Sequence, residues 1–339
     1  MESSWPVSAG RGTTVRVFEA ESPQKLYRDQ LSALLAEGAE VTVRGRPTKE
    51  ILDVATVIRN PRQRVHVVPG RWANPFLALS DSLHVLAGRS DVASLLPYNQ
   101  RIVEFSDDGH WLYGAYGPRI ANQIMPLIER LRANPTDRRA ILSIWEERDL
   151  QASTLDPPCN DIVAFKLRED RLYMTVFNRS NDLHWGLYAV NVYQFSILQE
   201  YIAARLQVEL GTQTHISNSL HVYTDELGAR ITKRMMDAQW PLPDLPDAQP
   251  LFPNGLPRHD TFVGDCNRVL DGEAYGDCPG IEEEGVAFLE FASDFLKEYR
   301  AHRAGVTVDL NGCRHGDYYA DWIVAAEEFL SHLAKPVKV

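Results

Sequence analysis

The sequence predicts an α+β protein, because helical and strand patterns are interspersed along the chain. Residues 192–206 carry apolar side chains at helical spacing. Residues 162–167 and 172–177 are rich in alternating apolar side chains and flank Glu169-Asp170, which predicts a β-hairpin. The 339 residues are 44% hydrophobic and 24% charged, so the chain can bury a substantial core. We expect a single domain over residues 1–339.

The remaining elements are expected in the following order. Residues 1–24 look irregular and form an N-terminal extension. Helices are expected at 23–37, 48–55, 74–87, 120–131, 282–303 and 320–334. Strands are expected at 41–45, 140–145 and 214–223. Six prolines between residues 240 and 257 predict a long surface loop.

Charge and hydropathy exclude several classes of function. The chain contains no apolar run of about 20 residues, so we expect no membrane span. Its N-terminus lacks a basic region followed by an apolar one, so we expect no signal peptide and a cytoplasmic protein. The net charge of −11 argues against non-specific binding to nucleic acid. A small phosphorylated substrate stays compatible, since a few arginines can line a pocket in an acidic protein.

The cysteines indicate one candidate nucleophile. The four cysteines are Cys159, Cys266, Cys278 and Cys313. No pair has C-x-x-C spacing, so we expect no zinc site, no other metal, and four reduced thiols. An ordinary cysteine of this kind is a small buried hydrophobe. Only Cys159 has distinctive neighbours, because it follows two prolines and lies upstream of the run Asn178-Arg179-Ser180-Asn181-Asp182.

Four short motifs occur in order at spacings that together resemble the thymidylate synthase family. They are Arg138-Arg139, Pro158-Cys159, Arg179-Ser180-x-Asp182 and His221-x-Tyr223. No single one is specific, but the resemblance covers roughly residues 26–235 and the C-terminal tail. It implies a mixed sheet layered with helices on one face. The other face would pack back to back against the sheet of a second subunit, giving a homodimer with shared active sites.

The resemblance implies one-carbon transfer to C5 of a pyrimidine nucleoside monophosphate. The thiolate of Cys159 would attack C6 of the base, which turns C5 into a nucleophile for the methylene of 5,10-methylenetetrahydrofolate. This chemistry needs a thiol of lowered pKa. Arg179 supplies a cation beside Cys159 that would lower it.

The same resemblance assigns catalytic and phosphate-binding roles. Asp81 would organise water and protons around the base, and Tyr116 would lie near the thiol. Arg179 and Ser180 would hold the phosphate together with Arg44 from a mobile loop. Arg138 and Arg139 would reach the phosphate from the partner subunit. The alternatives are an exposed helix carboxylate for Asp81 and solvated surface cations for Arg44 and the arginine pair.

The resemblance also assigns the base, the sugar and the folate. Asn191 would read the edge of the base. His221 and Tyr223 are two residues apart on a predicted strand, so both side chains face one side and would bind a sugar hydroxyl. Asp182 would meet the folate ring. Residues 335–339, ending in Val339, would fold over the bound ligands, or else fray.

The chain departs from the family pattern at three places, of which the first favours a hydroxymethylating branch. The family's methylating members carry a tryptophan about 14 residues before Tyr116, where this chain reads Arg101-Ile102-Val103-Glu104-Phe105. Asn160 replaces a histidine, and there is one extra residue between Gly186 and Asn191. Without the indole, water would add to the exocyclic methylene in place of hydride. The chain therefore resembles the nucleotide hydroxymethylases of phages and nucleoside-antibiotic producers.

Within that branch, the Ala- and Arg-rich composition favours antibiotic biosynthesis and a cytidylate hydroxymethylase of the mildiomycin type, with 5-hydroxymethyl-CMP as product. dCMP, UMP and dUMP stay open as substrates. One alternative is a thymidylate synthase that methylates dUMP. The other is a non-catalytic nucleotide-binding regulator, although the presence of Cys159 with Arg179 and Asp182 counts against it.

Overall fold

A mixed β-sheet forms the centre of the protein in the computed structural model, which describes residues 14–238, 241–273, 275, 287–313 and 318–333. Its main path runs β1-β3-β8-β6-β5-β4, with β2 paired to β3 and β7 paired to β8. The strands are β1 Arg16–Ala20, β2 Ala39–Val43, β3 Arg46–Ile58, β4 Ile141–Ser143, β5 Asn160–Arg168, β6 Arg171–Asn178, β7 Asn181–Asp182 and β8 Glu209–Tyr223. β8 runs parallel to β6 and antiparallel to β3. The predicted α+β class is confirmed.

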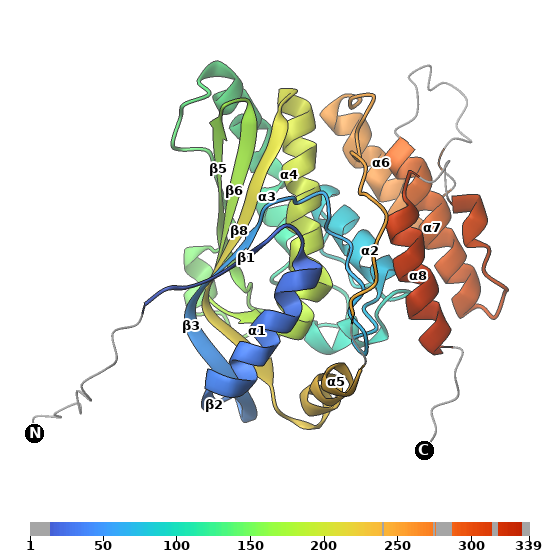
Figure 1. The fold of residues 1–339 in the computed structure, drawn as a ribbon. Helices are drawn as coiled ribbons and strands as arrows, with labels where there is room; N and C mark the ends of the chain where they lie inside the picture. The colour runs from blue at the N-terminus through green and yellow to red at the C-terminus, as the bar shows by residue number, and fades with distance from the viewer. Residues whose placement is uncertain (1–13, 239–240, 274, 276–286, 314–317, 334–339) are drawn as a thin grey trace, which may run out of the picture.

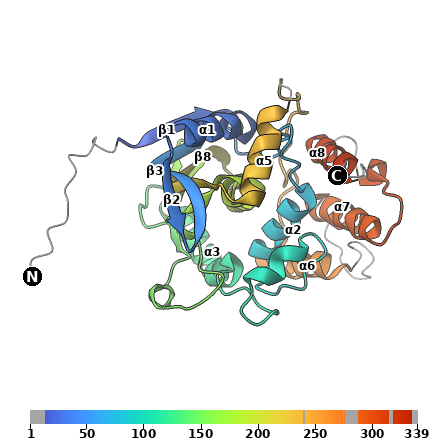
Figure 2. The same ribbon diagram turned by 90° about the horizontal axis from the view of Figure 1, so that it is seen from below.

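The helices are stacked outward from one face of this sheet. They are α1 Pro23–Glu37, α2 Pro75–Leu86, α3 Tyr116–Ala133, α4 Val192–Leu206, α5 Glu226–Asp237, α6 His259–Asp271, α7 Ala287–Arg303 and α8 Ala320–Leu333. α4 packs on β6 and β8, α2 packs on α4, and α6, α7 and α8 pack on the far side of α2 (Figure 1). Figure 2 shows the same order from below. No helix of the described part is long and apolar enough to cross a bilayer.

Apolar side chains from these layers form two main cores. Phe165 and Val176 of the sheet, Phe195 of α4 and Trp322 of α8 belong to one continuous core that reaches from β5 to the C-terminal helices. A second core lies beneath α1 and contains its Leu34. Full burial of a side chain of this size contributes about 1.5–3 kcal/mol. The C-terminal helices therefore share a core with the sheet, which fixes them against α2.

Several predicted elements are confirmed by the structure. The helices expected at 23–37 and 192–206 are α1 and α4, and the strand expected at 214–223 is the second part of β8. The predicted hairpin is formed by β5 and β6. Its turn residues Glu169 and Asp170 have φ of 50° and 53°. Positive φ at both central residues is the geometry that two-residue hairpin turns favour.

Two predictions near the N-terminus are wrong. Residues 48–55 belong to β3 and not to a helix, because β3 pairs along its length with β2, β1 and β8. These distant partners outweigh the local helical spacing. Residues 1–24 are not irregular throughout, since β1 and the start of α1 fall within them. β1 is a strand only because it pairs in parallel with β3.

The C-terminal third differs from its prediction in detail. Residues 241–257 contain no helix or strand, as expected of a loop, but Leu251 and Phe252 are buried in the main core. The segment therefore lies only partly on the surface, because these two apolar side chains pack into the core. Residues 335–339, including Val339, lie outside the described residues, as do residues 276–286 with Cys278.

Candidate active site

A cavity of about 280 Å³ opens where the end of β8 meets the residues that follow β6. Five predicted site residues line it: Arg44, Arg179, Ser180, His221 and Tyr223. Val43, Thr48, Glu50, Trp145, Pro157 and Ser219 complete the lining. Sequence motifs that lie up to about 180 residues apart thus meet in one concave site, in which two arginines favour an anionic ligand.

The β5–β6 hairpin brings Cys159 beside Arg179. Asn160 of β5 lies opposite Asn178 of β6, so the residues just outside this pair become neighbours. The guanidinium Nη2 of Arg179 lies 3.8 Å from the sulfur of Cys159. Its Nε donates to the carbonyl of Pro158 at 2.8 Å, which fixes its position. The predicted cation next to the exposed thiol is therefore present.

The expected lowering of the Cys159 pKa is wrong. Desolvation in the concave site raises the pKa of the thiol, and Arg179 only partly opposes this effect. The carboxylates of Asp156 and Asp182 raise the pKa further. Part of the hydrogen-bonding capacity of Arg179 is also taken by proline carbonyls. The surroundings of Cys159 therefore favour its neutral thiol form.

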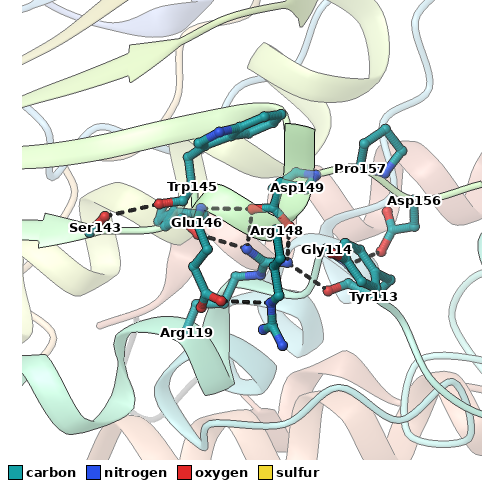
Figure 3. A network of polar contacts seen from close by, with 12 residues as sticks. Tyr113, Gly114, Arg119, Ser143, Trp145, Glu146, Arg148, Asp149, Asp156 and Pro157 are labelled. Carbon is teal, nitrogen blue, oxygen red and sulfur yellow. Dashed lines mark hydrogen bonds and ion pairs between the residues drawn. The ribbon is translucent and has the colours of Figure 1, made fainter. Parts of the chain in front are cut away.

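A buried ion pair supports the two segments that flank the thiol (Figure 3). Arg119 of α3 donates from Nη1 to Asp149 at 2.6 Å and from Nη2 at 3.0 Å, and neither side chain is appreciably exposed. The same guanidinium binds the carbonyl of Tyr113 at 3.1 Å. Asp156 accepts a hydrogen bond from the backbone of Gly114 at 2.8 Å. Removal of one member of such a buried pair costs about 3–5 kcal/mol, so the pair holds the surroundings of Cys159 rigidly.

Three acidic groups with raised pKa lie around the thiol. Asp81 accepts a hydrogen bond from Gln194 at 2.7 Å, and burial raises its pKa to about 7. The alternative that Asp81 is an exposed helix carboxylate is therefore wrong. The group can exchange a proton near neutral pH. Burial raises the pKa of Tyr116 well above 10, with Cys159 as the next cause, so its hydroxyl stays protonated. Burial also raises the pKa of Asp156 to about 6.

The segment Leu183–Asn191 is a π-helix that leads directly into α4. Asp182 caps it, because its carboxylate accepts from the backbone nitrogens of His184 at 2.7 Å and Trp185 at 3.3 Å. A π-helical turn holds more residues than an α-helical turn, and such turns are frequent at functional sites. A π-helix can accommodate the extra residue before Asn191, which is its last residue.

Asn191 lies in a buried cluster of asparagines. Its amide nitrogen donates to the side-chain oxygens of Asn160 at 3.5 Å and Asn181 at 3.4 Å. Asn178 also donates to Asn160. The side-chain nitrogen of Asn160 and oxygen of Asn178 are buried and have no partner among the described residues. The cluster therefore orients Asn191 and contains buried polar atoms that are still able to form hydrogen bonds.

The predicted His-x-Tyr pair faces the cavity from β8. The rings of His221 and Tyr223 are perpendicular, with centroids 5.4 Å apart. Arg46 stacks on Tyr223 at 3.7 Å and pairs with Asp225, so Arg44 is the loop arginine that lines the cavity. Thr48 and Glu50 of β3 lie close by in the lining.

Sequence reasoning missed two polar members of this site and a carboxylate near the thiol. Ser219 precedes His221 by two residues on β8, and its hydroxyl donates to Glu50 at 2.6 Å. The period of two along a strand is the signal that would have found Ser219. Glu50 was assigned to the wrong element. Asp156 directly precedes the Pro157-Pro158-Cys159 run.

The arginine pair lies away from the cavity of the same chain. Arg138 and Arg139 directly precede β4, at the edge of the sheet, whereas β8 is central. Arg139 pairs with Asp137 at 2.9 Å, and its side chain is 76% exposed. Within one chain these residues do not meet Cys159. Among the described residues, no three His, Cys, Asp or Glu side chains are placed to hold a metal ion.

Comparisons with known proteins agree on one family. The family model described as thymidylate synthase matches residues 25–248. The deoxyuridylate hydroxymethyltransferase of Bacillus phage SP01 is 40% identical over 233 residues, 64% of this chain and 61% of the relative. That of Pseudomonas phage M6 is 38% identical over 221 residues, 63% of each chain. A putative thymidylate synthase of Methanosarcina mazei is 29% identical over 215 residues, 61% of this chain and 89% of the relative.

The chain thus spans about three fifths of the length of the phage relatives. Among solved structures, thermostable thymidylate synthase A from Bacillus subtilis has a similar fold. Its TM-score is 0.54 at 21% identity, and the match covers 66% of this chain and 87% of that one. The layered mixed sheet that the sequence predicted is therefore the fold of that protein.

Proposed function

This chain belongs to the thymidylate synthase family, and we propose that it transfers a one-carbon unit from 5,10-methylenetetrahydrofolate to C5 of a pyrimidine nucleoside monophosphate. The observation that carries the proposal is the placement of Cys159 beside Arg179, 3.8 Å from its guanidinium, at a cavity that also presents Ser180 and His221. A thiol, an anion-binding group and a polar sugar site are the parts that this reaction requires.

The chemistry follows from these groups. The sulfur of Cys159 adds to C6 of the base, and the electron pair of the C5–C6 double bond moves toward the C4 substituent. C5 then attacks the methylene of the co-substrate, and the new carbon–carbon bond forms as the bond between this methylene and the first tetrahydrofolate nitrogen breaks. Loss of the C5 proton and departure of the second tetrahydrofolate nitrogen leave an exocyclic methylene. Water adds to this methylene, the sulfur of Cys159 leaves C6, and a 5-hydroxymethyl nucleotide results.

Named side chains provide the proton transfers and the positioning. Asp81 has a pKa of about 7, so it can both hold and release a proton at neutral pH. It transfers protons to and from the pyrimidine base and positions water beside it. Arg179 and Ser180 bind the phosphate, with Arg44 from the other wall. Asn191 contacts the edge of the base. Asp182 contacts the folate from its position at the start of the π-helix.

Two observations support hydroxymethylation over methylation. Both phage relatives are named deoxyuridylate hydroxymethyltransferases. Residues 101–105 hold no tryptophan, and Val103 is 43% exposed there. The absence of an indole from this segment would admit water to the exocyclic methylene more readily.

The relatives' names favour dUMP as the substrate, whereas the sequence resemblance led us to expect CMP. The asparagine cluster does not decide between them. A side-chain amide has a donor end and an acceptor end, so Asn191 accepts either base according to its orientation. The setting in nucleoside-antibiotic biosynthesis stays a prediction.

A homodimer with shared sites is part of this proposal. The sheet face opposite α4 is not covered by a helix, and it presents partly exposed side chains such as Tyr173 and Phe177 of β6 and Ile216 of β8. A second copy packed on this face by a two-fold axis would cover it. Arg138 and Arg139 would then reach the phosphate in the partner's cavity.

The test is incubation with methylenetetrahydrofolate and, separately, CMP, dCMP, UMP and dUMP. We expect a 5-hydroxymethyl nucleotide and free tetrahydrofolate, identified by mass spectrometry. A methylated base with dihydrofolate would show the methylating alternative. No product with any nucleotide, and no covalent trapping of Cys159 by a 5-fluoropyrimidine nucleotide, would favour a non-catalytic binding protein.

A further inference from the structure

A second cavity of about 250 Å³ lies against the π-helix. Trp185 and Ala189 of the π-helix form one of its walls. The segments 71–74 and 97–100 and Leu77 of α2 form another. Tyr299 and Arg303 of α7 and Phe329 of α8 close it. These last three residues fall outside the region 25–248 that matches the family model.

The charge of this cavity is positive. Arg71 and Arg303 line it, and its described lining contains no aspartate or glutamate. Arg71 is buried, and it donates to the hydroxyl of Tyr27 at 2.9 Å and to the carbonyl of His184 at 2.8 Å. Arg303 is exposed and makes no hydrogen bond or ion pair with the described residues. An exposed arginine in a cavity lining without carboxylates favours an anionic ligand.

The cavity is also aromatic, and its aromatic wall is held in place by distant elements. Trp72 has φ of 54°, a backbone conformation that is a genuine outlier for a bulky residue. Its indole lies between the guanidinium of Arg234 in α5 at 4.0 Å and the ring of His332 in α8 at 4.5 Å. Such conformations persist where the surroundings impose them and gather at ligand sites. Trp185 and Phe329 extend the aromatic lining.

We propose that α7 and α8 complete the co-substrate end of the active site, and that Arg303 binds the acidic tail of the one-carbon carrier. The proposal rests on the proposed function. Methylenetetrahydrofolate carries an aromatic amide that ends in glutamate carboxylates. A cavity with aromatic walls and a free cation at its rim suits that combination. The C-terminal helices would then select carriers with several carboxylates.

The test compares Arg303→Gln with Lys297→Gln, which removes one positive charge from an exposed position of the same helix away from the cavity. Calorimetry on the full chain, saturated with 5-fluoro-dUMP, would measure the affinity for tetrahydrofolate with one and with three linked glutamates. We expect Arg303→Gln to weaken binding of the triglutamate by about three- to tenfold, as for an exposed charged contact. We expect Lys297→Gln to bind like wild type and Arg303→Lys to recover most of the loss.

The outcomes separate this inference from the proposed function. Wild-type binding of both carriers, with Arg303→Gln unchanged, would overturn the role of Arg303 and leave the proposed function standing. An equal loss for Arg303→Gln and Lys297→Gln would show general charge attraction and would also overturn it. A wild-type protein that forms the nucleotide adduct but binds no folate would remove the proposed function and the inference with it. Unchanged affinity for 5-fluoro-dUMP in all variants shows that folding is intact.

Discussion

The two cavities are built in different ways. The first takes all its lining residues from 43–223, inside the region that matches the family. Three of the side chains that line the second cavity come from α7 and α8, outside that region. At the first, Arg179 of the lining lies beside the thiol of Cys159, whereas the second is lined by aromatic side chains and by Arg71 and Arg303. The first cavity thus lies wholly within the family match, whereas the second also depends on helices outside it.

The largest expected effect is that of Cys159→Ala, which should abolish the reaction at the first cavity and leave ligand binding intact. We expect complete loss of turnover, because no other described thiol is near the first cavity. Binding of nucleotide and of folate should persist, since the second cavity is untouched. Calorimetry and a turnover assay measure the two properties. Cys266→Ala and Cys313→Ala, at buried positions of the C-terminal region, should remain active. Retained turnover in Cys159→Ala would end the mechanism proposed for the first cavity.

Subunit mixing tests whether the first cavity is complete within one chain. Cys159→Ala and Arg139→Ala should each be nearly inactive alone. In a random mixture of the two, about a quarter of the sites should regain both residues, assuming an isologous two-fold dimer. Activity is measured after subunit exchange has been verified by native mass spectrometry. Absence of any recovery would show that Arg139 does not serve a neighbouring site.

Asp81 lies on α2, the helix that also contributes Leu77 to the second cavity. Burial raises its pKa from 3.8 to about 7, so the folded protein holds this proton more tightly than the unfolded chain. The free energy of unfolding should therefore fall as pH rises from about 4 to about 7, since the buried group must ionise. Urea unfolding of Asp81→Asn should lack this decline.

The same variant also tests catalysis. Loss of a proton-transfer group costs about a hundredfold or more in kcat, and the limb of the pH–rate profile near pH 7 should disappear. Nucleotide affinity should change little. A variant that keeps that limb would assign it to another group, with Asp156 as the next candidate because its pKa is raised to about 6.

The smallest expected effect concerns Asn191, at the C-terminal end of the π-helix. In Asn191→Asp the side chain only accepts, which favours cytosine protonated at N3. Use of UMP or dUMP should fall by about 1–3 kcal/mol, or roughly ten- to a hundredfold, the cost of an unpaired buried polar group. Use of CMP or dCMP should fall much less. The amides of Asn160 and Asn181, which now face a donor, must turn to accommodate the carboxylate.

The comparison of kcat/KM on all four nucleotides provides the measurement. Asn160→Ala is the matched variant, because it removes one acceptor that orients Asn191 and leaves Asn191 itself in place. It should reduce discrimination between the bases by less than Asn191→Asp does. Equal losses of Asn191→Asp on uracil and cytosine nucleotides would show that Asn191 does not contact the edge of the base.

The sequence by itself determined those parts of the protein that depend on local pattern. The spacing of apolar residues located α1 and α4, and the hairpin pattern placed Cys159 beside Arg179. The apolar positions Leu227, Ile231 and Met235, after the capping residue Asp225, would have located α5 as well. Such features follow from the periods of 3.6 and 2, which each segment carries alone.

Tertiary structure alone decided the features that depend on distant partners. β3 is a strand because β2, β1 and β8 pair with it, although its spacing is compatible with a helix. The pKa of Cys159 is raised because the folded surroundings desolvate it more than Arg179 stabilises its charge. The second cavity exists because a shared apolar core holds α7 and α8 against α2. Pairing, desolvation and packing depend on atoms that the folded chain brings together from far apart in sequence, so no local pattern records them.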